Sequence, residues 1–294
     1  MIGSKRSKIV RGSAFAAGLL AAVTVWQNVR VKLTRYHIRS VNLPSAFHGF
    51  RIALLSDIHS RDFGQNQEQL LRRIRAAKPD LILVAGDWVD ARHGTLETCL
   101  QQARLLRQIA PVCGVYGNHE LRRIRQTGKD PLRAAFSRAG VQMLHTSSTR
   151  VEKDGMYINL LGIEDPAELP EKPTRQQMTQ AVDEMLSRVT HGIQPDDFTI
   201  LIAHRPEFLR IYARYPIDLV VAGHAHGGQV RLPGVGGLFA PGQGLFPKFT
   251  GGCYRENRTE MIVSRGLGGY APVRVFNMPE LVVITLRAEG MERK

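Results

Sequence analysis

The stretch IDLVVAGHAH, residues 217–226, joins a short, mostly apolar run to two histidines that are one residue apart. An apolar run of this length is typical of a strand that is covered on both faces in a parallel sheet. Histidines directly after such a strand lie at its carboxyl end, which is where ligands bind in open α/β sheets. The stretch therefore predicts a buried strand with a binding site at its end.

Four other stretches repeat this arrangement of an apolar run followed by polar side chains. They are FRIALLSDIH (50–59), LILVAGDWVD (81–90), PVCGVYGNHE (111–120) and FTILIAHRPE (198–207). Helical patterns at 66–80 and 95–110 separate the first three, and this β-α-β-α-β order is typical of parallel strands covered by helices. We therefore predict an α/β fold in which five strand ends converge on one place.

The rest of the chain continues as alternating elements. A helix is expected at 132–140, three short strands within 141–165 with a turn at Asp154 and Gly155, and a helix at 176–188. The region after 217 is β-rich, and a glycine-rich apolar stretch at 232–249 looks irregular. No repeat or low-complexity linker divides the body, so residues 50–288 are predicted to form one catalytic domain.

The side chains at the five strand ends are of the types that bind divalent metal ions. They are Asp57, His59, Asp87, Asp90, Asn118, His119, His204, His224 and His226. Imidazole, carboxylate and amide donors without a thiolate suit Mn²⁺, Fe²⁺ or Zn²⁺. Glycines before Asp87, Asn118 and His224 allow the backbone to approach a crowded centre. Seven such groups are too many for one tetrahedral ion but suit two ions that share a carboxylate.

The positive charge of the chain is concentrated at its N-terminus. The formal net charge is +14, and the first 56 residues hold nine Lys or Arg and no acid. Without these nine, 31 basic and 26 acidic residues remain from Asp57 onward, which is an ordinary balance. The body also lacks an interleaved aromatic and basic stripe, so no stable nucleic-acid partner is expected. The three cysteines, which are odd in number and far apart, are interpreted as reduced thiols.

Residues 1–40 form a basic segment that resembles a membrane anchor or a signal sequence. An uncharged stretch from Gly12 to Val29 would span roughly 27 Å as a helix, close to the ~30 Å core of a bilayer. It fits a cleaved signal peptide, a single transmembrane anchor or an amphipathic helix in the interface; a helix packed on the domain is a further alternative. No small-residue cleavage site follows it, and basic residues on both flanks leave the membrane side undecided. We expect association with the cytoplasmic (inner) membrane of a bacterium.

The ordered motifs D-x-H, G-D-x-x-D, G-N-H-E, A-H-x-P and G-H-x-H between Asp57 and His226 resemble those of the calcineurin-like metallophosphoesterase superfamily. The later stretches GHAHGGQVRLPGVGG, SRGLGG and NMPELVVITL resemble its bacterial membrane-associated YkuE/YaeI-type branch, and that branch is similar to enzymes that cleave the pyrophosphate of UDP-2,3-diacylglucosamine. The resemblance implies a sandwich of two mixed β-sheets flanked by helices in four layers.

The resemblance also implies a role for each motif residue. Asp57, His59 and His226 would bind one ion, Asn118, His204 and His224 the other, and Asp87 would bridge them. His119 would donate a proton to the leaving group, or stabilise its charge, and Asp90 would orient His119. Glu120 is interpreted mainly as a residue that supports its loop. Many phosphatases of the family place an arginine directly after G-D-x-x-D, but Ala91 stands there, so Arg205 and Arg265 are alternative phosphate ligands.

These observations predict a dinuclear, metal-dependent phosphoester hydrolase that attacks with a metal-bridging hydroxide, with Mn²⁺ as the favoured ion. The favoured function is that of a membrane-associated phosphodiesterase or pyrophosphatase acting on a lipid-linked or nucleotide-sugar substrate. The alternatives are a soluble-substrate nucleotide phosphodiesterase or nuclease, and a protein that keeps its metals for structure alone. The complete set of metal-binding side chains disfavours the last alternative.

Overall fold

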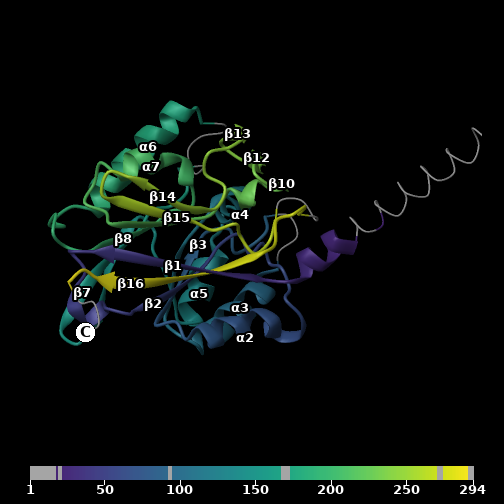
Figure 1. Cartoon of the computed structure of the whole chain (residues 1–294), viewed down its shortest axis with the longest axis horizontal. Coiled ribbons are helices and arrows are strands. Elements are labelled where there is room, and N and C mark those ends of the chain that lie inside the picture. The colour runs from purple at the N-terminus through teal and green to yellow at the C-terminus, as the bar shows by residue number, and fades with distance from the viewer. Residues whose placement is uncertain (1–17, 19–21, 92–94, 167–172, 270–273, 291–294) are drawn as a thin grey trace, which may run out of the picture.

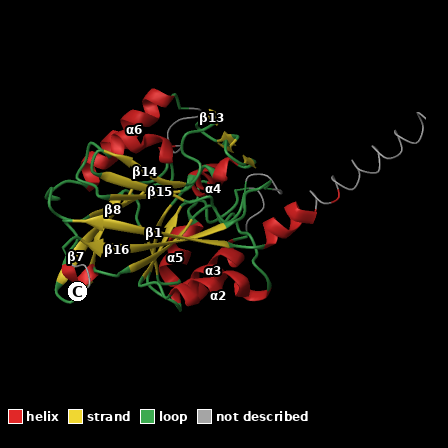
Figure 2. Cartoon of the chain, viewed as in Figure 1, coloured by secondary structure: helices red, strands yellow, loops and turns green. Residues whose placement is uncertain are grey.

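The computed structural model describes residues 18, 22–91, 95–166, 173–269 and 274–290 of the chain. Two six-stranded mixed sheets pack face to face, and helices cover both outer faces (Figures 1 and 2). The molecule therefore has four layers, and the predicted α/β sandwich of two mixed sheets is confirmed.

The first sheet has the strand order β1–β16–β2–β3–β4–β5. Its strands are β1 (Lys32–Ser40), β16 (Glu280–Ala288), β2 (Arg51–Leu55), β3 (Leu81–Ala85), β4 (Val112–Val115) and β5 (Val141–Met143). Strands β2 to β5 are parallel to one another, whereas β16 runs antiparallel to β2 and parallel to β1. The parallel part of the sheet thus contains the first three stretches that the sequence analysis singled out.

The second sheet has the order β14–β15–β9–β8–β7–β6. Its strands are β14 (Gly252–Glu256), β15 (Thr259–Val263), β9 (Leu219–Ala222), β8 (Thr199–Ile202), β7 (Met156–Gly162) and β6 (Ser147–Lys153). Between β9 and β14 lie two small hairpins, β10 (Arg231–Leu232) with β11 (Gly236–Gly237) and β12 (Phe239–Ala240) with β13 (Gly244–Leu245). The stretch that looked irregular from its sequence therefore contains two short hairpins.

The helices divide between the two outer faces. The first sheet is covered by α2 (Glu68–Ala77), α3 (Leu96–Arg107), α4 (Asn118–Thr127) and α5 (Pro131–Arg138). The second is covered by α6 (Arg175–Val189) and α7 (Leu209–Tyr212). The apolar faces of these helices are the reason that the strands can be apolar on both sides.

Alternation along the strands builds the core between the sheets. In β2, Ile52 and Leu54 contact the core shared with the second sheet, whereas Ala53 and Leu55 contact the helices. Successive side chains of a strand point to opposite faces, so one apolar run serves both layers. The packed sandwich fixes where the strands end, and all of the candidate metal-binding residues follow strand ends.

Edge strand β1 and helix α4 are the two longest of the described elements that were not predicted. Residues 32–40, assigned from sequence to the N-terminal segment 1–40, form edge strand β1 of the first sheet, in register with β16. The pairing joins residues almost 250 positions apart, which no local pattern reveals. Helix α4 was also missed, because the sequence NHELRRIRQT has few apolar residues.

Within the described residues, no helix is long and apolar enough to cross a membrane. Residues 22–29 are helical, but most of the earlier part of the segment that the sequence predicts to be an anchor lies outside the described residues. All three cysteines are free, as expected from their spacing.

Candidate metal centre

The candidate ligands come together beyond the carboxyl ends of the parallel strands. Asp57 and His59 follow β2, Asp87 follows β3, Asn118 begins α4, His204 follows β8, and His224 and His226 follow β9. Six of these seven residues are buried, and the side chain of His59 is only 4% exposed. The five strand ends named in the sequence analysis therefore converge on one buried cluster, which both sheets build.

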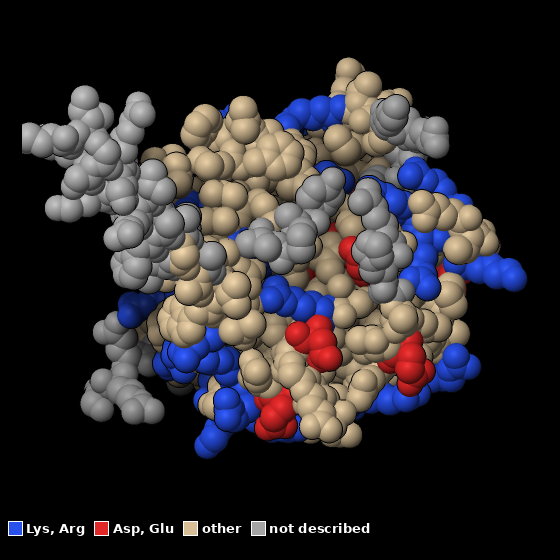
Figure 3. Space-filling model, turned by 90° about the vertical axis from the view of Figure 1, so that its right-hand side faces the viewer, with Lys and Arg blue, Asp and Glu red and all other residues tan. Residues whose placement is uncertain are grey.

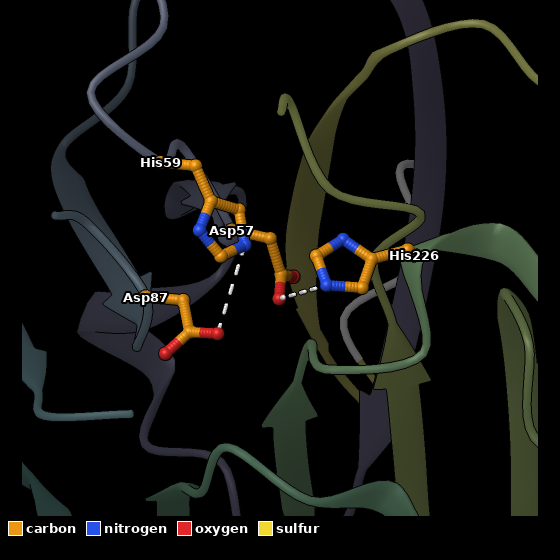
Figure 4. A group of neighbouring side chains, drawn as sticks. All are labelled: Asp57, His59, Asp87 and His226. Carbon is orange, nitrogen blue, oxygen red and sulfur yellow. Dashed lines mark ion pairs between the residues drawn. The ribbon is translucent and has the colours of Figure 1, made fainter. Parts of the chain in front are cut away.

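A first group within this cluster consists of Asp57, His59, Asp87 and His226, each of which offers one ligand atom within 4.8 Å of the others. His59 Nε2 lies 3.7 Å from Asp87 Oδ2, and His226 Nε2 lies 3.7 Å from Asp57 Oδ1. Figure 4 shows the four side chains pointing toward a common centre. Two carboxylates and two imidazoles in this arrangement can hold a divalent cation.

A second group consists of Asp87, His204 and His224. His204 Nε2 lies 3.3 Å from Asp87 Oδ2 and 3.1 Å from His224 Nδ1. Asn118 is buried in the same cluster of loops, and its Oδ1 has no hydrogen-bond partner. Because Asp87 belongs to both groups, the residues can hold two ions that share one carboxylate.

The hydrogen bonds of the histidines fit a role as metal ligands. His204 Nδ1 lies 2.7 Å from the carbonyl oxygen of Ala85, so it donates its proton there and leaves the Nε2 lone pair facing Asp87 and His224. Two facing ring nitrogens repel each other unless a proton or a cation lies between them. Both ring nitrogens of His59 are buried without a hydrogen-bond partner. The residues present therefore fit a pair of metal ions.

The charge balance of the cluster favours a cation. Burial holds the pKa values of His224 and His226 well below their usual range, so both are neutral, as metal ligands must be. Burial also acts on the Asp87 pKa, raising it, but the facing His204 lowers it well below its ordinary value. The same contact raises the pKa of His204 to about 10 against the effect of burial. Without metal, a proton on His204 thus takes the place of the cation.

Several residues of the cluster have an unusual backbone conformation. Left-handed φ angles are found at Asp57 (48°), His59 (51°), Asp87 (52°), His224 (64°) and His226 (47°). Each costs a non-glycine residue about 1–2 kcal/mol, and such strain is typical of functional sites. The strain is held by hydrogen bonds, because the His224 N–H donates to the Asp57 carboxylate at 3.0 Å and the His119 N–H to Asp87 Oδ1 at 2.9 Å.

Two glycines allow the loops to approach this closely. A Cβ atom at Gly117 would collide with Asp87 Oδ1, and one at Gly223 would lie 2.5 Å from Asp57 Oδ2. Both glycines directly precede a candidate ligand, Asn118 and His224. The close approach that the sequence analysis inferred from these glycines is therefore present.

His119 and Asp90 form a third group with His59. The Ala91 N–H donates to His119 Nδ1 at 3.1 Å, which places the proton of the neutral ring on Nε2. Asp90 Oδ2 lies 3.6 Å from His119 Nδ1 and 3.5 Å from His59 Nδ1, so it lies between the two rings. The backbone of the Asp90–Ala91 loop, more than the Asp90 carboxylate, therefore sets the tautomer of His119. Burial lowers the pKa of His119, which keeps the ring neutral.

Glu120 supports the loops, as its sequence context suggested. Its carboxylate accepts hydrogen bonds from the N–H groups of Asp87 at 3.1 Å, Val89 at 2.8 Å and Gly117 at 2.8 Å. The side chain is buried, and burial, followed by the nearby Asp87 charge, raises its pKa to about 7. One carboxylate thus ties the loop after β3 to the start of α4.

The two arginines named as alternative phosphate ligands both face carboxylates. Arg205 Nε lies 2.8 Å from Asp165 Oδ2, and its NH1 lies 3.3 Å from Glu207 Oε1. Arg265 Nε lies 3.8 Å from Glu280 Oε1. The Arg205 guanidinium already contacts the buried carboxylates of Asp165 and Glu207. The expectation that Arg205 binds substrate phosphate is therefore not supported. Arg92, the arginine that follows Ala91 after the G-D-x-x-D motif, lies outside the described residues.

Sequence reasoning missed two residues behind the centre. Asn277 Nδ2 donates to the His226 carbonyl at 2.7 Å, and the fully buried Arg274 donates to the carbonyls of Gly266 at 2.9 Å and Gly268 at 2.7 Å. The Gly268 N–H in turn donates to the Asp57 carbonyl. Both residues lie about 50 positions after the histidine loop. Asn277 begins the stretch NMPELVVITL, but the resemblance gave neither residue a role.

The buried cluster offers seven side chains with N or O donors at strand ends, and one of its carboxylates belongs to two groups, so it is able to hold a dinuclear metal site. The comparisons with known proteins agree. The family model described as calcineurin-like phosphoesterase matches residues 50–228, and the chain belongs to this family.

Three relatives match most of the chain. It is 28% identical to the uncharacterized metallophosphoesterase YkuE of Bacillus subtilis, over 96% of this chain and 98% of that protein. It is 26% identical to the phosphodiesterase YaeI of Escherichia coli, over 81% and 82% of the two chains. It is also 24% identical to the UDP-2,3-diacylglucosamine pyrophosphatase LpxG of Chlamydia muridarum, over 86% and 88%. The chain is a metallophosphoesterase, a hydrolase of phosphoester bonds, with residue clusters able to hold a dinuclear metal site.

Proposed function

We propose that the protein is a dinuclear metal-dependent phosphodiesterase or pyrophosphatase that acts at a membrane surface on a lipid-linked or nucleotide-sugar substrate. The observation that carries the proposal is the sharing of Asp87 between two groups of ligands. Asp57, His59 and His226 would hold one ion, and Asn118, His204 and His224 the other. When bound there, two divalent ions supply a nucleophile at neutral pH and stabilise the charge of an in-line displacement. Imidazole, carboxylate and amide donors suit Mn²⁺, Fe²⁺ and Zn²⁺. Of these ions we favour Mn²⁺.

His119 completes the proposed chemistry. In hydrolysis, one P–O bond forms from water, the P–O bond to the leaving group breaks, and the leaving oxygen gains a proton. The hydrogen bond from Ala91 places the proton of the neutral His119 ring on Nε2, where it can donate a hydrogen bond to the leaving oxygen. We assign His119 the role of stabilising the charge of the leaving oxygen, which then takes its proton from solvent water. Asp90, between His119 and His59, would position both rings.

The membrane part of the proposal rests on the N-terminal segment and on one relative. The first 56 residues hold nine basic residues and no acid, which suits contact with anionic lipid. LpxG is named for a substrate that carries two acyl chains, and it aligns with 86% of this chain. A lipid-linked phosphoester as substrate would explain why a phosphoesterase carries such a segment.

The test is hydrolysis of bis(p-nitrophenyl) phosphate by the full chain with added Mn²⁺, beside the variants Asp87→Asn and His119→Ala. We expect each variant to lose at least about 100-fold in kcat/KM, because Asp87→Asn weakens the shared metal ligand and His119→Ala removes a donor that stabilises the leaving oxygen. Unchanged turnover by either variant would overturn the assignment of the site. A UDP-diacylglucosamine lipid in micelles, assayed in parallel, separates the proposed substrate class from the alternative of a soluble nucleotide.

A further inference from the structure

Exposed apolar side chains are concentrated on the two small hairpins after the histidine loop. Of the eleven exposed large hydrophobic residues in the described part of the chain, five lie between 231 and 246. They are Leu232 (41% exposed), Val235 (60%), Phe239 (47%), Leu245 (74%) and Phe246 (71%). We call this segment, residues 231–246, the apolar hairpins. Isolated exposed apolar residues are ordinary, but a group of this kind marks an interaction surface.

The pairing of the hairpins directs these side chains outward. Phe239 pairs directly with Leu245 across β12 and β13, so their side chains lie side by side on one face. The neighbouring Ala240 points the other way and is completely buried against the second sheet. Two-residue ladders are marginal in water on their own. The hairpins are thus anchored by one face and present the other, apolar face to the surroundings.

The apolar hairpins lie next to the metal centre. They begin five residues after His226, and the Leu238 N–H donates to the carbonyls of Gly228 at 3.2 Å and Val230 at 2.9 Å. Gly228 and Gly237 pack so closely that a Cβ atom at either would collide with the other. Whatever binds the hairpins is therefore held beside the histidine loop.

A second exposed apolar group lies at the same end of the molecule. The helix at 22–29 exposes Val25, Trp26 and Val29, and Figure 1 shows it at the same end of the long axis as β10, β12 and β13. Asn28 fastens this helix near the centre, because its side chain exchanges hydrogen bonds of 2.8 Å and 3.1 Å with the backbone of Arg274. The helix and the hairpins are thus two apolar contacts at the site end.

Basic side chains border both contacts. The Arg30 guanidinium lies 4.6 Å from the centroid of the Trp26 ring, and Lys248 lies two residues after Phe246, over the Phe249 ring. Figure 3, which views this end, shows Lys and Arg side chains, with Asp and Glu side chains among them, around surface formed by uncharged residues. Apolar tips bordered by cations match the interface of an anionic bilayer, where rings and aliphatic chains enter the headgroup region and cations meet phosphate.

We propose that the apolar hairpins insert into the surface of an anionic lipid bilayer and turn the metal centre toward the membrane. This proposal rests on the proposed function, because a membrane contact is useful to an enzyme whose substrate lies in the membrane. The insertion itself can be measured independently of any hydrolytic activity. It assigns the membrane contact to Leu245 and Phe246 at the second hairpin in addition to the N-terminal segment.

The direct test places a tryptophan on the hairpins of the full chain. Phe246→Trp is made together with Trp26→Phe, so that the remaining native Trp88, which is 1% exposed, is a constant background. Phosphatidylcholine and phosphatidylglycerol vesicles with brominated acyl chains are the probe. We expect a blue shift and quenching of the new tryptophan. The matched control is Met156→Trp in the same background, because Met156 is exposed but begins β7, at the strand ends opposite the centre.

Quenching at position 246 but not at 156 is the expected result. An unquenched tryptophan at 246 in protein that co-sediments with the vesicles would overturn the proposal, as would equal quenching at both positions. Hydrolysis of bis(p-nitrophenyl) phosphate by the same variants is recorded separately. Insertion without hydrolysis would refute the proposed function alone, whereas hydrolysis without insertion would refute this proposal alone.

A second variant tests the strength of the contact. Leu245→Ser with Phe246→Ser is expected to lower partitioning into the anionic vesicles at least tenfold and to leave hydrolysis of the soluble phosphodiester unchanged. The control is Val41→Ser with Met156→Ser, which removes two exposed apolar side chains at the other end of the strands and is expected to partition as the wild type does. If the hairpin variant instead abolishes a dimer in light scattering and leaves vesicle binding intact, the surface is a subunit interface and the proposal is wrong.

Discussion

At the scale of single residues, Asp87 connects the two halves of the metal centre. It contacts His59 and His204, accepts a hydrogen bond from the His119 backbone, and has a left-handed φ of 52°. A strained residue with three such contacts holds its position only if its own backbone is fixed. Glu120 fixes the backbone, because its carboxylate accepts hydrogen bonds from the N–H groups of Asp87, Val89 and Gly117.

We therefore predict that Glu120→Ala destabilises the protein strongly. The substitution leaves three N–H groups without their acceptor, and each buried group of this kind costs about 1–3 kcal/mol. Urea unfolding should show a loss of at least about 3 kcal/mol, with a smaller loss for Glu120→Gln, whose amide oxygen still accepts part of the set. A loss below about 1 kcal/mol in Glu120→Ala would show that the carboxylate does not hold the loops.

At the scale of elements, the strands that carry ligands were predictable from sequence and the others less so. An apolar run indicates a buried strand, and Asp or His directly after it indicates a candidate ligand. The strands β2, β3, β8 and β9 and their candidate ligands could therefore be predicted from short stretches of sequence. Edge strand β1 (KLTRYHIRS) mixes charged, polar and apolar residues and has no apolar run, and its partner β16 lies at the far end of the chain. Left-handed φ angles at Asp57 and Asp87 were equally hidden, because tertiary hydrogen bonds impose them.

The inclusion of β1 in the sheet is itself testable. Ile38 is 2% exposed and packs in the core between the two sheets. We predict that Ile38→Ala lowers the free energy of unfolding by about 2–4 kcal/mol, the usual cost of truncating a buried aliphatic side chain. Val41→Ala, at a position that is 77% exposed just after the strand, is the control and should change it by less than about 0.5 kcal/mol. Equal effects of the two substitutions would mean that β1 does not pack on the domain.

At the scale of the whole molecule, the excess of basic residues and the candidate metal ligands lie in different parts of the chain. The body from Asp57 onward has nearly balanced charge and contains the metal centre, whereas the basic excess precedes it. The site end of the sandwich also exposes the apolar hairpins and the helix at 22–29. This arrangement is suited to a phosphoesterase that works on a substrate presented at an interface.

The N-terminal charge should set the affinity for anionic membranes. We predict that replacing Lys5, Arg6, Lys8 and Arg11 by Gln in the full chain weakens binding to phosphatidylglycerol-containing vesicles by roughly 1 kcal/mol per residue at low salt. The difference from wild type should shrink as salt is raised, because the attraction is screened. Co-sedimentation over a series of NaCl concentrations measures both effects. If the four substitutions leave vesicle binding unchanged, these basic residues do not contribute to membrane binding and the prediction is wrong.

The dinuclear centre is tested most directly by the number of divalent ions bound to each chain. The full-length protein is stripped with a chelator, dialysed to equilibrium against Mn²⁺ and measured for metal and protein content by mass spectrometry. We predict two ions per wild-type chain and one in His226→Ala, which removes a ligand from one group and leaves Asp87, His204 and His224 intact. Only one ion, or none, in the wild-type chain would contradict a centre in which two metals share Asp87.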